Sequence, residues 1–300
     1  MLNYDELALG EGGPWLGPLA IPGEQAGRLF PKQEALARID RLAGAKNLAF
    51  TGGEPLAHPD IIEIVRAARV AGYERILART DCDGLADRDL LGSVMGEGVS
   101  HFEVMLCREG DDCGPLSPRQ FRTRFPGIRN VRRIGELSEA LSNTYLAAVI
   151  PVGRKNHELM AGFLESAFAT IDIDRVVFCW GDPGFPIWHA RESIARAIDQ
   201  CTEKRVWAVT RGIPLCVVPR HAAHLEELFA PGVRGTALPV PASCGPCCYR
   251  PICSGMPGAG SAYAWDPEKA IPPACPPEVA DIWAKGHVFD ETNAHLYDRR

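Results

Sequence analysis

The chain has 300 residues, of which 46% are hydrophobic and 23% charged, and acidic residues outnumber basic ones by 38 to 32. These proportions exclude a collagen-like, coiled-coil or wholly disordered chain, and no apolar run approaches the roughly 20 residues of a membrane-spanning helix. The net charge of −6 disfavours nucleic acid as a partner. Eleven Cys, an odd number in a chain too large to need disulfide staples, favour free thiols and metal ligands in a cytoplasmic protein without a signal peptide.

Short apolar runs alternate with amphipathic segments along the first two thirds of the chain. The six runs predicted to be strands are 6–9, 47–50, 75–78, 101–106, 145–150 and 175–180. The helical patterns between and after them are 31–43, 59–71, 87–95, 134–142, 156–169 and 190–204. Apolar strands linked through helices form parallel sheets, so six such units predict an α/β fold, a partial (β/α)6 TIM-like barrel.

The composition changes after about residue 205, because Gly, Pro and Cys crowd the stretch 214–277. We therefore expect two regions. Residues 1–205 form the barrel, and residues 206–300 form a small Cys-rich C-terminal extension that binds a metal or a cluster.

A glycine-rich turn follows the second predicted strand and reads Thr51-Gly52-Gly53-Glu54-Pro55. Two adjacent glycines let the backbone approach a ligand closely, and Glu54 adds an acceptor beside them. The turn therefore suits an ammonium or amino-acid group, with a plain strand-to-helix turn as the alternative.

The surroundings of this turn, residues 47–85, resemble the radical S-adenosylmethionine (radical SAM) superfamily. The order is a strand, the GGEP turn, His58-Pro59, a helix and a third strand whose end carries Thr80, Asp81 and Gly84, with an insertion and with Asp in place of the usual Asn. The resemblance covers roughly residues 5 to 180 and implies a partial barrel. It also implies that Gly52, Gly53, Glu54 and Pro55 hold the methionine amino group of SAM.

The cysteine loop of that superfamily is missing. Radical SAM chemistry requires three thiolates in a CxxxCxxC loop after the first strand, which leave one iron of a [4Fe–4S] cluster open for SAM. The first Cys of this chain is Cys82, past the third predicted strand, and Gly10, Pro14 and Gly17 stand at the expected spacing. The resemblance thus implies a degenerate member without the cluster that cleaves SAM.

Four other thiols fall at or near predicted strand ends: Cys82, Cys107, Cys113 and Cys179. A non-standard cluster could use them. Small buried packing residues are the favoured interpretation, because Cys is among the most buried residue types.

The C-terminal region contains a denser cysteine motif. Cys244 and Cys247 have the CxxC spacing of metal ligands, Cys253 follows in the same loop, and Cys216 is the expected fourth ligand, with Cys248 or Cys275 as alternatives. The motif resembles the tail of many radical SAM proteins, which implies an auxiliary [4Fe–4S] cluster. Zinc remains the alternative, since four thiolates suit both, and four unrelated thiols are the third interpretation.

An arginine-rich segment lies between the fourth and fifth predicted strands. Its six arginines, with Phe121 and Phe125 among them, are Arg119, Arg122, Arg124, Arg129, Arg132 and Arg133. A solvated amphipathic face is the favoured interpretation, and binding of an acidic peptide or of nucleic acid bases is the alternative.

These features predict a radical-SAM-like iron–sulfur protein without the SAM-cleaving cluster, in which SAM binding itself remains open. It would act as a partner or substrate-binding component in peptide or small-molecule modification and bind a peptide substrate or an active radical SAM enzyme. One alternative is a SAM-dependent enzyme that uses a non-standard cluster or non-radical chemistry, with Glu11, Asp81, Asp83 and Glu103 as candidate bases. A zinc-stabilised scaffold is the other, and no catalytic residue is assigned.

Overall fold

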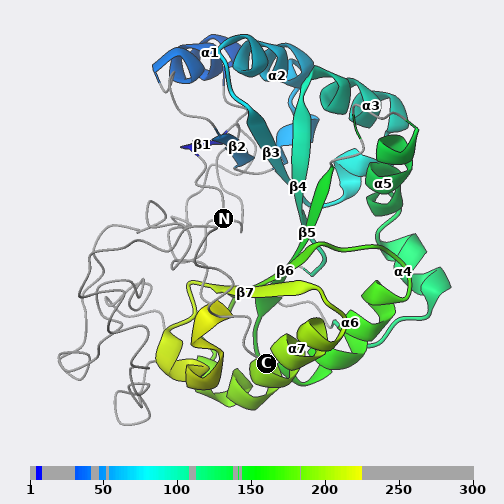
Figure 1. Cartoon of the computed structure of the whole chain (residues 1–300), viewed down its shortest axis with the longest axis vertical. Helices are drawn as coiled ribbons and strands as arrows, with labels where there is room; N and C mark the ends of the chain where they lie inside the picture. The colour runs from blue at the N-terminus through cyan, green and yellow to red at the C-terminus, as the bar shows by residue number, and fades with distance from the viewer. Residues whose placement is uncertain are drawn as a thin grey trace.

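The structure, a computed structural model, describes residues 5–8, 31–41, 47–51, 54–107, 113–137, 141, 144–182 and 184–224. Figure 1 shows their strands as an arc, with the helices on its outer side. Among these residues no helix is long and apolar enough to cross a membrane.

Strands and helices alternate along the chain. The strands are β1 (Asp5–Ala8), β2 (Asn47–Thr51), β3 (Arg75–Thr80), β4 (Val99–Met105), β5 (Tyr145–Val152), β6 (Arg175–Trp180) and β7 (Trp207–Arg211). The α-helices are α1 (Lys32–Arg41), α2 (Ile61–Val70), α3 (Arg88–Glu97), α4 (Pro118–Arg124), α5 (Ile128–Glu136), α6 (Met160–Phe168) and α7 (Arg191–Glu203). Short 3₁₀ helices are η1 (Pro55–Ala57), η2 (Asp83–Ala86), η4 (His157–Leu159), η5 (Ile187–Ala190), η6 (Leu215–Val217) and η7 (Pro219–His224).

The sheet contains the six predicted strands in sequence order, and every neighbouring pair is parallel. Right-handed crossovers through helices place successive parallel strands side by side, which explains this order. The predicted partial barrel is confirmed. A seventh strand, β7, pairs with β6 and lies past residue 205, where no strand was predicted.

The predicted helix over 134–142 is wrong. The structure instead has α4 and α5 in this connection, and α5 ends at Glu136. Helix α4 begins with a capping box, in which the Ser117 and Gln120 side chains bond each other's backbone N–H groups. The arginine-rich segment is helical because Phe121 and Val131 give it a buried face.

The two faces of the sheet carry different side chains because successive residues of a strand point to opposite sides. On the outer face, Ile76, Phe102 and Phe178 belong to the main core between sheet and helices. The inner, concave face has a smaller apolar cluster of Met105, Val149, Val177 and Val209. Polar and charged side chains can therefore gather on the concave face.

Candidate functional site

Two turns meet where β2 and β3 end, at the edge of the sheet where parallel α/β proteins place their chemistry. Glu54 follows β2, and its Oε2 accepts hydrogen bonds from Thr80 Oγ1 at 2.7 Å and from the Asp81 backbone N–H at 2.8 Å. Its Oε1 accepts from the Leu56 N–H at 2.9 Å. The Glu54 carboxyl group thus joins the predicted ligand-binding turn to the end of β3.

The environment of Glu54 raises its pKa to about 7, chiefly because the carboxyl group is buried and also because it shares a hydrogen bond with the Asp81 side chain. The Thr80 hydroxyl and the backbone N–H groups of Asp81 and Leu56 act in the opposite direction. Near neutral pH, Glu54 is therefore divided between its protonated and ionised forms.

Close packing keeps these turns in contact. A Cβ atom at Gly84, in η2, would lie 2.5 Å from Leu56 Cβ in η1, closer than side chains can approach. Cys82, the residue just before η2, adopts the left-handed conformation with φ of 82°, which is rare for a residue other than glycine. Gly84 is the last residue of the predicted Thr-Asn-Gly-like turn, and its lack of a side chain is required here.

Of the predicted SAM-binding residues, Glu54 and Pro55 are in the described part of the chain, where Pro55 is buried at the start of η1. Gly52 and Gly53 lie outside the described residues, so their predicted role stays a prediction.

Of the predicted metal ligands, only Cys216 is described. It lies half-buried in η6, packed against the main core. Its proposed companions Cys244, Cys247 and Cys253, and the alternatives Cys248 and Cys275, lie outside the described residues.

The thiols considered for a non-standard cluster are not equivalent. Cys107 and Cys113 form a disulfide with their Cα atoms 6.2 Å apart, so the expectation of free thiols is wrong for these two residues. Cys82 is buried and Cys179 is half-buried on β6, and neither forms a disulfide with another described residue. Throughout the described ranges, no group of three or more His, Cys, Asp and Glu side chains could hold a metal ion.

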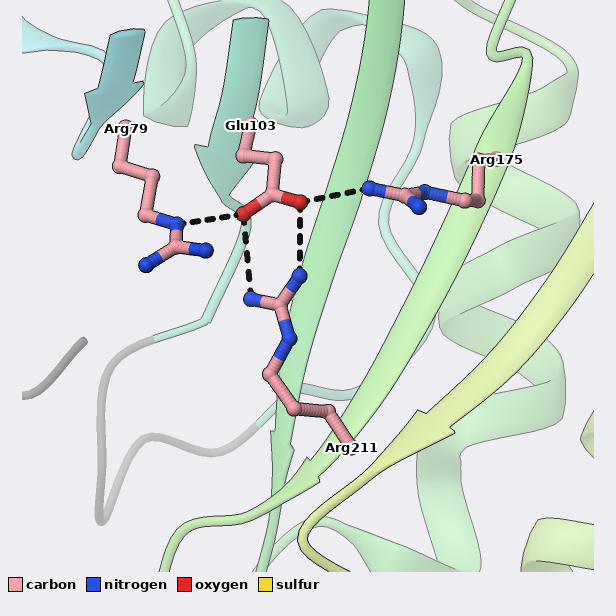
Figure 2. Close-up of polar contacts among 4 residues, drawn as sticks. All are labelled: Arg79, Glu103, Arg175 and Arg211. Atoms are coloured by element: carbon pink, nitrogen blue, oxygen red, sulfur yellow. Dashed lines mark hydrogen bonds and ion pairs between the residues drawn. The ribbon is translucent and has the colours of Figure 1, made fainter. Parts of the chain in front are cut away.

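A second polar cluster lies on the concave face, where three arginines surround Glu103 of β4 (Figure 2). Arg79 Nε lies 2.7 Å from Oε2, and Arg175 Nη2 lies 2.6 Å from Oε1. Arg211 approaches both oxygens, with Nη2 at 2.7 Å from Oε1 and Nη1 at 3.1 Å from Oε2. The carboxylate of Glu103 therefore links β4 to arginines of β3, β6 and β7.

The strand register explains how this cluster forms. Glu103 lies directly opposite Arg79 on the neighbouring strand. On its other side it is aligned with Ala147 of β5, which is in turn aligned with Arg175 of β6. The small side chain of Ala147 leaves room for Glu103 and Arg175 to meet across β5.

The charge of this cluster argues against Glu103 as a general base. Burial by itself would raise the pKa of Glu103, but the charges of Arg211, Arg79 and Arg175 outweigh burial and hold the pKa well below its usual range. A carboxylate that stays ionised at neutral pH is a weak proton acceptor. Glu103 therefore has a structural role, which is to hold the arginines of three other strands.

Sequence reasoning missed the arginine cluster. The available signal was Arg79, a charged residue that follows the apolar run Ile76–Ala78 within strand β3, because a buried charge requires a partner. The partner could not be named without the strand register, since Arg211 and Glu103 are 108 positions apart. Of the other candidate bases, Glu11 lies outside the described residues, and Asp81 and Asp83 lie in the turn after β3.

No protein-family model matches the chain. Among solved structures, it is similar to SuiB of Streptococcus suis, with 14% identity, a TM-score of 0.45 and coverage of 69% of this chain and 49% of the other. It is also similar to PhdJ bound to a substrate intermediate, with 16% identity, a TM-score of 0.36 and coverage of 71% and 60%. Neither similarity bears on the activity of this chain.

Among curated proteins, the chain is similar to a probable GTP 3′,8-cyclase of Saccharolobus solfataricus. The two are 26% identical over an alignment of 145 residues, and the match covers 46% of this chain and 43% of the relative. The match thus spans less than half of the relative's length. Together with the motif of residues 47–85 and the parallel sheet, this similarity supports the resemblance of the chain to the radical SAM superfamily.

Proposed function

We propose that this chain is a radical-SAM-like protein that does not itself cleave SAM and that serves as a partner or substrate-binding component for the modification of a peptide or small molecule. A peptide substrate or an active radical SAM enzyme would be its binding partner. We place this role in the cytoplasm, with the thiols of the C-terminal region as ligands of a metal or cluster.

One observation carries this proposal: no Cys precedes Cys82 in the sequence, so the residues that follow β1 supply no thiolate ligand for the radical-generating cluster. The donor set of this part of the chain does not fit that [4Fe–4S] cluster. The thiols near the strand ends are poor substitutes, because Cys107 and Cys113 are bonded to each other and Cys82 is buried.

The retained turns support a binding role. Glu54 connects the GGEP turn to Thr80 and Asp81, so the family's SAM-binding turn keeps its packing against the end of β3 although the cluster ligands are gone. We propose that Gly52, Gly53, Glu54 and Pro55 bind the amino group of SAM or of another amino acid. No iron is available for the amino and carboxylate groups of SAM to chelate, so part of the binding free energy is lost. Every loss of about 1.4 kcal/mol lowers the affinity about tenfold.

The C-terminal cysteines complete the proposal. We propose that Cys216, Cys244, Cys247 and Cys253 hold an auxiliary [4Fe–4S] cluster, with zinc as the alternative and with Cys248 or Cys275 as alternatives to Cys216. Cys216 supports this in one respect. Its side chain packs beside the main core but is only half-buried, so it is accessible to a metal ligand set from another segment.

The test is anaerobic incubation of the purified chain with SAM and dithionite, followed by chromatography for 5′-deoxyadenosine. No turnover is expected. Iron, sulfide and zinc are quantified in the same preparation, and SAM binding is titrated separately. Multiple turnovers by the chain alone would overturn the proposal and favour a non-standard cluster. Zinc without sulfide, combined with no SAM binding, would favour the scaffold alternative.

A further inference from the structure

Helices α4 and α5 follow one another on the outer side of the sheet (Figure 1). Their sequences carry a concentration of positive charge. Arg119, Arg122 and Arg133 are exposed, and Arg129 is half-exposed. None of these four makes an ion pair with any carboxylate in the part of the chain that the structure describes. We call these four side chains the α4–α5 basic surface.

The two remaining arginines of this segment are occupied. Arg132 donates to Asp174 Oδ2 at 2.7 Å and to the carbonyl oxygen of Thr144. The Arg124 guanidinium lies 5.6 Å from the centre of the Phe125 ring. The α4–α5 basic surface therefore consists of arginines for which the fold itself shows no use.

Three surface cations on α1 and α2 are arranged differently. Lys32 pairs with Glu63, Arg38 with Glu34, and Arg66 with Glu97. Exposed helix faces usually mix both signs in this way, because pairs of opposite charge stabilise helices slightly. From Arg119 to Arg133 the sequence has no acidic residue, and Glu136 at the end of α5 is the first to follow, in a chain whose net charge is −6.

The spacing of the four arginines adds to this contrast. Arg119 and Arg122 are three positions apart on α4, and Arg129 and Arg133 are four positions apart on α5, so each pair lies on one face of its helix. Like charges at these spacings repel and destabilise a helix. Folding alone does not favour this arrangement, whereas recognition of an anionic partner would.

The aromatic residues of this segment decide between a polypeptide and a nucleic acid. Phe121 and Phe125 are buried and pack against Phe163, with ring centres 5.9 and 6.1 Å from it. They cannot serve as a platform on which bases stack, which single-stranded nucleic acids require. Guanidinium groups without exposed aromatics fit side-chain carboxylates.

We propose that the α4–α5 basic surface docks an acidic segment of a partner polypeptide, rich in Asp and Glu. The inference rests on the proposed partner role and assigns a surface to it. Docking leaves the concave face and the GGEP turn accessible, because α4 and α5 lie on the outer side of the sheet.

The test measures fluorescence anisotropy of a labelled deca-glutamate peptide with the full chain, in the absence of SAM. The variant replaces Arg119, Arg122, Arg129 and Arg133 by Gln, and about tenfold or greater loss of affinity is expected at low salt. The control variant replaces Lys32, Arg38, Arg41 and Arg66 by Gln, which makes the same change in net charge on α1 and α2. Its affinity should stay within about twofold of the unmodified chain, since the cations of α1 and α2 lie outside the proposed docking surface and act on the peptide only through screened long-range attraction.

Folding of both variants is checked by circular dichroism, and the α4–α5 variant should melt at the same temperature as the unmodified chain or higher because like-charge repulsion is relieved. Equal loss of peptide affinity in both variants, or no loss in either, would overturn the proposal. Tighter binding of labelled decauridylate than of the peptide, abolished in the α4–α5 variant, would overturn it in favour of nucleic acid. Because SAM is absent, none of these outcomes is confused with a failure of the proposed function.

Discussion

Glu103 and Arg211 lie 108 positions apart in the chain and form a two-point ion pair on the concave face, with Nη2 2.7 Å from Oε1 and Nη1 3.1 Å from Oε2. The same carboxylate bonds Arg79 and Arg175, so a single side chain of β4 is linked to three other strands. Among the described strands, β1 and β7 do not pair with each other, so such a link helps to set how far the arc bends.

We predict that Glu103→Gln destabilises the protein strongly. The amide keeps the size of the side chain but leaves the guanidinium groups of the buried Arg79 and Arg175 and of the half-buried Arg211 without their shared carboxylate. Loss of one partner from a buried ion pair costs about 3–5 kcal/mol. Urea unfolding followed by circular dichroism measures the loss from the shift of the midpoint.

The matched control is Arg38→Gln, which removes the exposed pair with Glu34 on α1. Exposed pairs of this kind contribute at most about 0.5 kcal/mol. If Glu103→Gln costs no more than the control, the arginine cluster has no role in stability.

A second prediction tests the packing of α5 against the turn after β3. A Cβ atom at Gly127 would lie 2.1 Å from the carbonyl carbon of Leu85 and 2.3 Å from the backbone nitrogen of Ala86. Backbone cannot move aside as a flexible side chain can, so Gly127→Ala should cost at least about 1–3 kcal/mol in the free energy of unfolding.

Gly92 provides the contrast, because it lies inside α3 with no heavy atom within 4 Å of an added Cβ. Gly92→Ala should stabilise the protein by about 0.5–1 kcal/mol through its better helix propensity. Effects of the same sign and size for the two substitutions would mean that α5 does not approach Leu85 as described.

The sheet could be predicted from the sequence because apolar runs bounded by helical patterns are a strong local signal. The run 175–180 coincides with β6, and the run 145–150 is extended by two residues in β5. Strand β7 was missed because its five residues, Trp207–Arg211, end in a charged side chain and lie where the composition changes. The helix over 134–142 was misplaced because the many arginines of α4 and α5 hide the apolar face of each helix. That face includes Phe121 on α4 and Val131 on α5.

The candidate site was predictable only in part. Glu54 was found because the GGEP turn is local in sequence and resembles a known family. The role of Glu103 depends on side chains from β3, β6 and β7, whose approach follows from strand register and not from any single segment. Residues that are adjacent only in space leave no local pattern, so Glu103 was assigned as a candidate base.

For the C-terminal region, we predict that Cys244→Ser combined with Cys247→Ser removes the bound metal or cluster. It should also loosen residues after about 205 and leave the barrel folded. Thiolates must bind deprotonated and together, so loss of two ligands abolishes the site and uncouples it from folding. Iron, sulfide and zinc analysis of the purified protein measures the effect.

Cys201→Ala is the control for this experiment. Burial raises the pKa of the Cys201 thiol to about 12, so it stays protonated and is not a metal ligand. Its replacement should leave the metal content unchanged. Equal metal content in the Cys244 and Cys247 double variant and in the unmodified protein would contradict the assignment.

The last prediction concerns the pH dependence of stability through Glu54. In the unfolded chain a Glu ionises near 4.5, whereas folded Glu54 keeps its proton up to about 7. Between these values the folded state holds a proton that the unfolded state has released, so this contribution is complete below about pH 4.5 and is lost as pH rises to about 7. Glu54→Gln mimics the protonated form and should remove about 1–3 kcal/mol of this dependence.

His101, whose pKa burial lowers to about 4, acts in the opposite direction in an overlapping range, but its contribution cancels in the difference between variant and unmodified protein. Asp81→Asn should reduce the dependence without abolishing it, since burial is the larger cause and the Asp81 hydrogen bond the smaller. The measurement is the midpoint of urea unfolding at half-unit intervals of pH, and parallel curves for Glu54→Gln and the unmodified protein would rule out a proton on Glu54 at neutral pH.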